Sequence, residues 1–189
     1  MKSVSAVVTF LILLVFSPSA QASIVYNVNH AIGAGSINGF VQTNGTLGVL
    51  SSADIINWNL NLSAPNLVGG PNVNINFGNQ TQTLLSGATT TATPTSLIFD
   101  MSGGSGIGFF LLQGGIASSS DFWILETALA GWTGSGVGEH IGFNTDGTTV
   151  AQTTIHPGNF VFGTSVPEPG HAVLLGIGVI SALIFRRRR

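Results

Sequence analysis

Glu139, His140 and His156 are the residues of this chain whose types and spacing could do chemistry. A carboxylate with two imidazoles could bind a metal ion, or could act as a general base together with the acid that orients it. The three residues are too few and too dispersed for a recognised zinc pattern. Adjacent residues of a strand also point to opposite faces, so Glu139 and His140 would not converge on one ion. We therefore expect half-exposed polar residues near a turn, with no metal and no cofactor.

Other segments that resemble ligand-binding loops each lack a necessary part. The tight turn Asn144–Gly147 offers oxygen ligands of the kind that calcium prefers, but Asp146-Gly147 by itself predicts a plain hairpin turn. The glycine-rich stretches 104–108 and 134–138 do not have the spacing of a dinucleotide fingerprint, and no P-loop lysine exists. The chain also has no Gly-x-Ser-x-Gly nucleophile elbow. The sequence therefore predicts no catalytic residues.

The acids and the absence of cysteine narrow the chemistry further. A secreted hydrolase would need acids that converge, such as Asp121 and Glu126, and nothing in the sequence brings these two together. The chain contains no cysteine, which excludes disulfides, Cys-ligated metals and a thiol nucleophile. The sequence thus favours a protein that is not an enzyme.

Four aromatic residues, Tyr26, Trp58, Trp123 and Trp132, could form a face that stacks on sugar rings. Trp58 and Trp123 lie in strand-like runs, where packing in the core is the expectation. Trp132 lies in a glycine-rich loop, so it is the one that we expect to be exposed. A role for Trp132 as a loop anchor leads, and a carbohydrate-binding module with Trp132 as its glycan contact stays open.

Every lysine and arginine lies near an end of the chain: Lys2 at the start, and Arg186, Arg187, Arg188 and Arg189 at the end. The body between them, residues 23–165, carries six acidic residues and a net charge of about −6 with neutral histidines. Binding to nucleic acid requires cationic side chains that replace phosphate counterions. The sequence therefore excludes nucleic acid as a partner.

Alternation of apolar and polar residues predicts that the body is built from β-strands. In residues 56–62 apolar side chains alternate with asparagines, and residues 72–77 repeat the pattern. We expect further strands at 24–29, 36–43, 46–50, 81–85, 96–101, 107–112, 122–127, 140–143, 150–155 and 159–162. Asn44-Gly45 and Asp146-Gly147 are signals for type I′ hairpins, and the low-complexity stretch 86–94 is expected to be an exposed loop. The prediction is a single all-β domain, a β-sandwich or jelly-roll-like fold, with an up-and-down barrel as the alternative.

The first residues, 1–22, have the features of a signal peptide. Lys2 gives a basic start, and residues 6–16 form an apolar stretch that is too short to span a membrane comfortably. Ala20 and Ala22 supply the small side chains that signal peptidase requires. We expect a signal helix that is cleaved after Ala22, and an uncleaved N-terminal anchor is the alternative.

The last residues, 166–189, have three parts in a fixed order. Val166-Pro167-Glu168-Pro169 should be extended and accessible to a peptidase, because proline cannot continue a helix. The apolar run 172–185 would be about 21 Å long as a helix at ~1.5 Å per residue. Arg186–Arg189 can snorkel to the cytoplasmic headgroups and so extend its span. We expect a transmembrane helix at 171–185 with the arginines inside the cell, and an anchor that is never cleaved is the alternative.

This tail resembles the PEP-CTERM sorting signal, in which a Val-Pro-Glu-Pro motif is followed by an apolar helix and a terminal arginine cluster. The resemblance covers residues 166–189, about an eighth of the chain. It implies that the sorting motif, Val166 to Pro169, is handled by exosortase, a membrane-embedded thiol peptidase or transpeptidase of bacteria.

The sequence therefore predicts an exported, non-enzymatic protein of a bacterial surface or extracellular matrix. Its expected partners are signal peptidase, exosortase and, transiently, the inner membrane. In the alternative function, a carbohydrate-binding module, an exopolysaccharide is the further partner.

Overall fold

The computed structural model of the chain describes residues 22–65, 67, 70–78, 81–85, 87, 89–102, 107–113, 120–127, 137–144 and 148–166. The strands within these ranges are β1 (Ile24–Ile32), β2 (Gly35–Thr43), β3 (Gly48–Val49), β4 (Ile55–Ser63), β5 (Asn72–Asn76), β6 (Thr81–Leu85), β7 (Thr90–Ala92), β8 (Ser96–Asp100), β9 (Ile107–Gln113), β10 (Ser120–Glu126), β11 (Gly138–Asn144), β12 (Thr148–Thr154) and β13 (Asn159–Ser165). A 3₁₀ turn, Ser52–Asp54, precedes β4. The all-β class predicted from the alternation is therefore confirmed.

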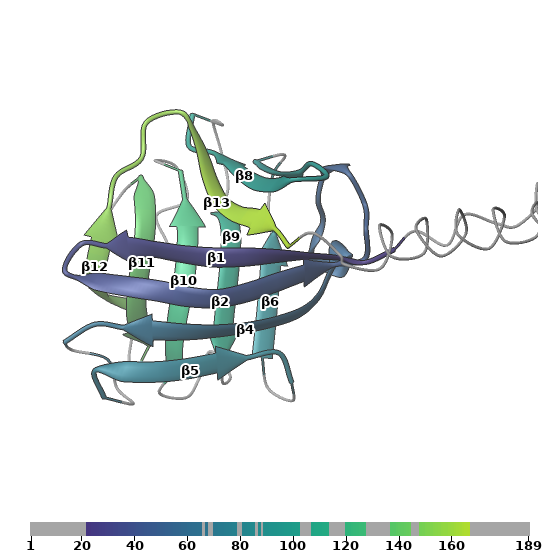
Figure 1. Cartoon of the computed structure of the whole chain (residues 1–189). Helices are drawn as coiled ribbons and strands as arrows, with labels where there is room; N and C mark the ends of the chain where they lie inside the picture. Colours follow the sequence, from purple (N-terminus) through teal and green to yellow (C-terminus); the bar gives the residue numbers. More distant parts are fainter. Residues whose placement is uncertain are drawn as a thin grey trace, which may run out of the picture.

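The strands form two antiparallel sheets. The larger sheet has the order β3-β7-β8-β13-β1-β2-β4-β5, and the smaller has the order β12-β11-β10-β9-β6. In Figure 1 the strands β1, β2, β4 and β5 lie across those of the smaller sheet, which are behind them in this view. Each layer can thus bury one face against the other.

β1 and β2 are joined by a short hairpin, whereas the last strand returns to lie beside the first. The turn between β1 and β2 has two residues, and its first, Gly33, has the positive φ of 58° that such turns need. β13 comes back to lie between β8 and β1, with Tyr26 paired to Ser165. The two ends of the described domain therefore lie on neighbouring strands.

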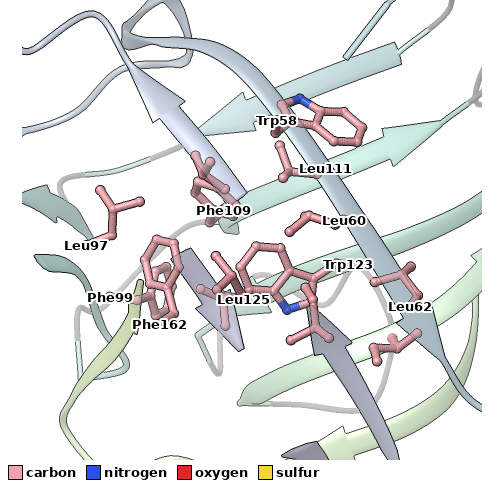
Figure 2. Packing of buried hydrophobic residues seen from close by; sticks show 14 of the residues in the cluster. Trp58, Leu60, Leu62, Leu97, Phe99, Phe109, Leu111, Trp123, Leu125 and Phe162 are labelled. Atoms are coloured by element: carbon pink, nitrogen blue, oxygen red, sulfur yellow. The ribbon is translucent and has the colours of Figure 1, made fainter. Parts of the chain in front are cut away.

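Apolar side chains from both sheets fill the space between the layers. In β4, Trp58, Leu60 and Leu62 are fully buried, whereas the asparagines between them are on the outer face. Trp123 from β10 contacts Phe162 from β13 edge to face, with ring centroids 5.6 Å apart. Figure 2 shows these side chains pointing toward one another across the core. The alternation predicted for residues 56–62 is confirmed from Trp58 to Leu62, but it fails at Ile56, which is 40% exposed while Ile55 is buried.

Three other local predictions are wrong. Asn44-Gly45 does not make a hairpin between β2 and β3, because Asn44 N–H donates to the carbonyl of Asp54 at 2.9 Å and β3 pairs with β7 instead. The stretch 86–94 contains β7, which packs next to β8 and is not an exposed loop. Phe77 was expected to point inward, but it lies beyond the end of β5 and is 47% exposed. By contrast, the antiparallel pairing of β11 with β12 agrees with the hairpin predicted there.

Candidate functional site

The carboxylate of Glu139 lies at the centre of a polar cluster inside the core. Its side chain, on β11, is completely buried. Trp123 donates its indole N–H to Oε1 at 2.7 Å. The Nε2 atom of His30 lies 2.6 Å from Oε1, and the Nε2 atom of His156 lies 2.9 Å from Oε2. Because a carboxylate oxygen accepts, both imidazoles donate from Nε2. We call Glu139, His30, His156 and Trp123 the carboxylate–histidine cluster.

This cluster ties elements of both sheets together. His30 comes from β1 of the larger sheet, while Glu139 and Trp123 come from the smaller sheet. His156 follows β12, and its ring stacks on Phe160 at 3.5 Å between centroids and 9° between planes. The ring of Phe160 also meets His30 edge to face at 5.3 Å. Each imidazole is therefore held by a hydrogen bond and by an aromatic ring.

The sequence-based expectation for Glu139 and His140 is right about their directions and wrong about their burial. Both side chains are fully buried, not half exposed. They make no common contact, since Nδ1 of His140 lies 2.9 Å from the hydroxyl of Thr153 and its Nε2 lies 3.5 Å from a carboxylate oxygen of Glu126. Adjacent strand residues face opposite ways, as the pleat requires.

One member of the cluster, His30, was missed at the level of sequence. His30 is 109 residues from Glu139, and no local pattern connects the two. The signal that could have found it is the inward position of His30 among Tyr26, Val28 and Ile32, which alternate as buried residues of β1. A histidine at such a position needs a partner inside the core.

The cluster offers little access to a reactant. Both oxygens of Glu139 are occupied, and the two histidine side chains are 21% and 19% exposed while their Nε2 atoms are engaged with the carboxylate. Within the described ranges, no group of three or more His, Cys, Asp or Glu residues could hold a metal ion. Asp121 and Glu126, the acids considered for a hydrolase, are both buried on β10 at positions that face opposite ways. What the cluster can do is fix the two sheets against each other.

A second feature, a polar groove, lies where β13 separates from β1. The ladder between these strands consists of Tyr26 with Ser165 and Asn27 with Thr164, and beyond it β13 turns away, as Figure 1 shows. The resulting groove has a volume of about 530 Å³. Its lining includes the exposed residues Asn27, Asn29, Asn38, Val161 and Thr164. None of these five side chains carries a charge.

The aromatic residues considered for sugar binding lie in the core where the structure describes them. Trp58, Trp123 and Tyr26 are fully buried, which confirms core packing as their role. Trp58 donates its indole N–H to the hydroxyl of Thr83 at 3.1 Å, and the hydroxyl of Tyr26 donates to the carbonyl of Thr93 at 2.7 Å. Trp132 lies outside the described residues.

The predicted signal peptide, residues 1–22, and the predicted sorting tail, residues 166–189, lie mostly outside the described residues. Ala22 is the first described residue and is exposed, and Val166 is the last and is 40% exposed. Ala20, Pro167, Glu168, Pro169, the predicted helix 171–185 and the arginines 186–189 all lie outside. Among the residues that are described, no helix has the length and apolarity to cross a membrane.

Comparison of the chain with protein-family models, with curated proteins and with solved structures finds no match.

Proposed function

We propose that this chain is an exported, non-enzymatic protein of a bacterial cell surface or extracellular matrix. Signal peptidase removes residues 1–22, and the tail 166–189 holds the chain in the inner membrane. Exosortase then cleaves near the sorting motif, Val166 to Pro169, and the body is delivered outside the cell. The body's lack of lysine and arginine supports this route, because positive residues favour retention on the cytoplasmic side.

The observation that carries the proposal is where the domain ends. β1 begins at Ile24 and β13 ends at Ser165, and the two strands pair with each other. Val166 N–H donates to the carbonyl of Val25 at 2.9 Å, so the ladder closes one residue before Pro167. A cut beyond Val166 leaves every strand pair of the domain in place. The tail can thus be cleaved off without loss of any strand pairing in the domain.

The fold supports a structural or binding role more than a catalytic one. We classify the two crossed antiparallel layers as a β-sandwich, and the return of β13 to the side of β1 is the kind of long connection found in Greek-key and jelly-roll folds. The carboxylate–histidine cluster has a buried carboxylate with both oxygens engaged. Such a group stabilises a domain and offers a substrate no base.

Sorting is tested by expressing the full chain with and without an exosortase and measuring intact masses of the membrane and released fractions. We expect a released form that lacks residues after the sorting motif only when the peptidase is present, and an Arg-tailed membrane form without it. Glu168→Ala should block release, whereas Pro157→Ala, at an exposed proline between β12 and β13, should not. Persistence of the arginine tail on all mature protein in the competent host would refute the sorting proposal.

A second candidate function is a carbohydrate-binding module that acts at the cell surface. The groove between β1 and β13 favours it, because three asparagines and Thr164 in its lining offer amide and hydroxyl groups to a hydroxyl-rich ligand. The test is retention of the detergent-solubilised full chain on immobilised polysaccharides, including the polymer made by the producing organism. Retention that is weakened by Trp132→Ala would make Trp132 the contact, and the absence of retention on all polymers would remove this function.

A further inference from the structure

The outer face of β1, β2, β4 and β5 carries asparagines that line up across the strands. One row runs from strand to strand through Asn29, Asn38, Asn61 and Asn74, which are paired in register. All four side chains are exposed. Neighbouring strands are about 4.8 Å apart, so the amides of a row repeat at about the length of one sugar unit in an extended polysaccharide.

A second row beside the first contains an aromatic ring. It runs through Asn27, Phe40, Asn59 and Asn76, again paired in register. Odd-numbered residues of β2 face the core, since Ile37 and Val41 are buried. Phe40 has the opposite parity and therefore points outward. Phe40 is partly exposed and has an asparagine on either side of it. We call these two rows the asparagine face.

Four amides of this face, on β4 and β5, hold one another in place. Asn74 donates from Nδ2 to Oδ1 of Asn59 at 2.7 Å and to Oδ1 of Asn61 at 3.0 Å. Asn76 donates from Nδ2 to Oδ1 of Asn74 at 3.2 Å. Side chains that are already ordered lose less conformational entropy when they bind a ligand. The face is therefore prepared for a ligand that exchanges hydrogen bonds with amides.

Charge decides which ligands fit. β1, β2, β4 and β5 contain no Asp, Glu, Lys or Arg, and the one histidine among them, His30, points inward to Glu139. An acidic polymer would find no cation on this face, and a basic one would find no anion. Hydroxyl groups can both donate to and accept from an amide, so neutral sugars match the whole surface.

We propose that the asparagine face is the binding site for a neutral polysaccharide chain. A pyranose ring stacks its apolar face on Phe40 while Asn38 and Asn59 bond its hydroxyls, since sites of this kind combine an apolar platform with a few fixed polar groups. The chain continues into the groove beside β1, which Asn27, Asn29 and Asn38 also line. This inference rests on the carbohydrate-binding function and names its face and its ligand class.

The experiment uses the full chain in detergent, with amylose, cellulose and curdlan as neutral probes and alginate as the acidic one. We expect retention on at least one neutral polymer and little on alginate. Phe40→Ala and Asn38→Ala should each weaken binding about three- to tenfold, the loss expected for one net contact. Phe40→Tyr should keep it, because the ring remains. Asn159→Ala is the matched control, an exposed strand asparagine outside both rows.

Each other outcome overturns a distinct statement. Retention that is unchanged in both Phe40→Ala and Asn38→Ala, with urea midpoints like the parent, shows that this face is wrong while carbohydrate binding stands. Equal retention on alginate refutes the neutral class of ligand. A fall in oligomeric mass in these variants, without a change in retention, makes the face a contact between copies of the chain. No retention of the parent on any polymer removes the binding function itself and leaves the sorting proposal untouched.

Discussion

Replacing Glu139 by glutamine tests the role of the carboxylate–histidine cluster. The change keeps the shape of the side chain but puts an NH₂ donor where one acceptor oxygen was. His30, Trp123 and His156 all direct nitrogen atoms at this carboxylate. An NH₂ in the place of Oε1 faces the indole N–H of Trp123, which can only donate. An NH₂ in the place of Oε2 faces Nε2 of His156, which accepts only when the imidazole carries its proton on Nδ1.

The size of the effect follows from these contacts. With the amide oxygen in the place of Oε1, the bonds to His30 and Trp123 become bonds to a neutral acceptor, and the bond to His156 is lost unless its imidazole changes tautomer and accepts from the NH₂. A hydrogen bond to a charged group is worth about 1.5–3 kcal/mol and one between neutral groups about 1 kcal/mol. His156 can turn its ring to water because 19% of it is exposed, which limits the loss there. We expect Glu139→Gln to lower the free energy of unfolding by about 2–4 kcal/mol.

Urea unfolding followed by tryptophan fluorescence measures this, since Trp123 reports on its own surroundings. With a slope of about 1–3 kcal/mol per molar urea, the midpoint should fall by roughly 1–2 M with no change in slope. The matched control is Asp100→Asn, the same chemical change at a partly exposed carboxylate that accepts from Ser102 at 2.6 and 2.9 Å. It should cost about 1 kcal/mol or less.

A double-mutant cycle with Trp123→Phe separates the cluster from general packing. If the indole N–H and the carboxylate interact as described, the two changes together should cost less than their sum by about 1 kcal/mol. An effect of Glu139→Gln no larger than that of Asp100→Asn, or strict additivity in the cycle, would refute the reasoning.

Two other predictions concern Asp54, in the 3₁₀ turn before β4, and Gly39, in β2. Ser51 donates to Asp54 from its backbone N–H and its hydroxyl, each at 2.7 Å, and these bonds lower the pKa of Asp54 from 3.8 to about 2. Because the pKa of Asp54 is lower in the folded state, this stabilisation is complete above the unfolded pKa and is lost as pH falls from about 4 toward 2. Asp54→Asn should therefore lower the free energy of unfolding by about 1 kcal/mol at pH 7 and show no such difference from the parent at pH 2. Urea titration at each pH measures both values. A Cβ on Gly39 would overlap the carbonyl oxygen of Asn59, so Gly39→Ala should cost more than about 2 kcal/mol in thermal unfolding. Gly48→Ala, with φ of 89° but nothing within 4 Å of its Cβ, should cost only about 1 kcal/mol, and a reversed order would contradict the close approach of β2 and β4.

Alternation of apolar and polar residues predicted individual strands well. The sequence did not predict which strands pair with each other when the partners are far apart in the chain. In β4 the alternation of Trp58, Leu60 and Leu62 with asparagines is enough to give both the strand and its buried face. The turn signal Asn44-Gly45 misled, because the partner of β3 is β7 and only the folded chain shows that choice.

The candidate sites show the same limit. The alternation predicts that asparagines of β4 and β5 face outward, but their alignment into rows depends on the register between strands, which no local pattern states. The rule that neighbouring residues face opposite ways placed Glu139 and His140 correctly. It could not reveal His30 or the burial of the carboxylate, because both arise from packing one sheet on the other.

Because the first strand, β1, pairs with the last, β13, the two ends of the described domain lie close together. Tyr26 and Ser165 are opposite one another, so a short linker could join the two ends without moving a strand. New ends could then be opened between β11 and β12, and the same sheets would remain. The fold therefore does not require the chain ends to lie between β13 and β1. Because both ends of the described domain lie at one place on the larger sheet, the two cuts that we propose would leave the rest of its surface unchanged.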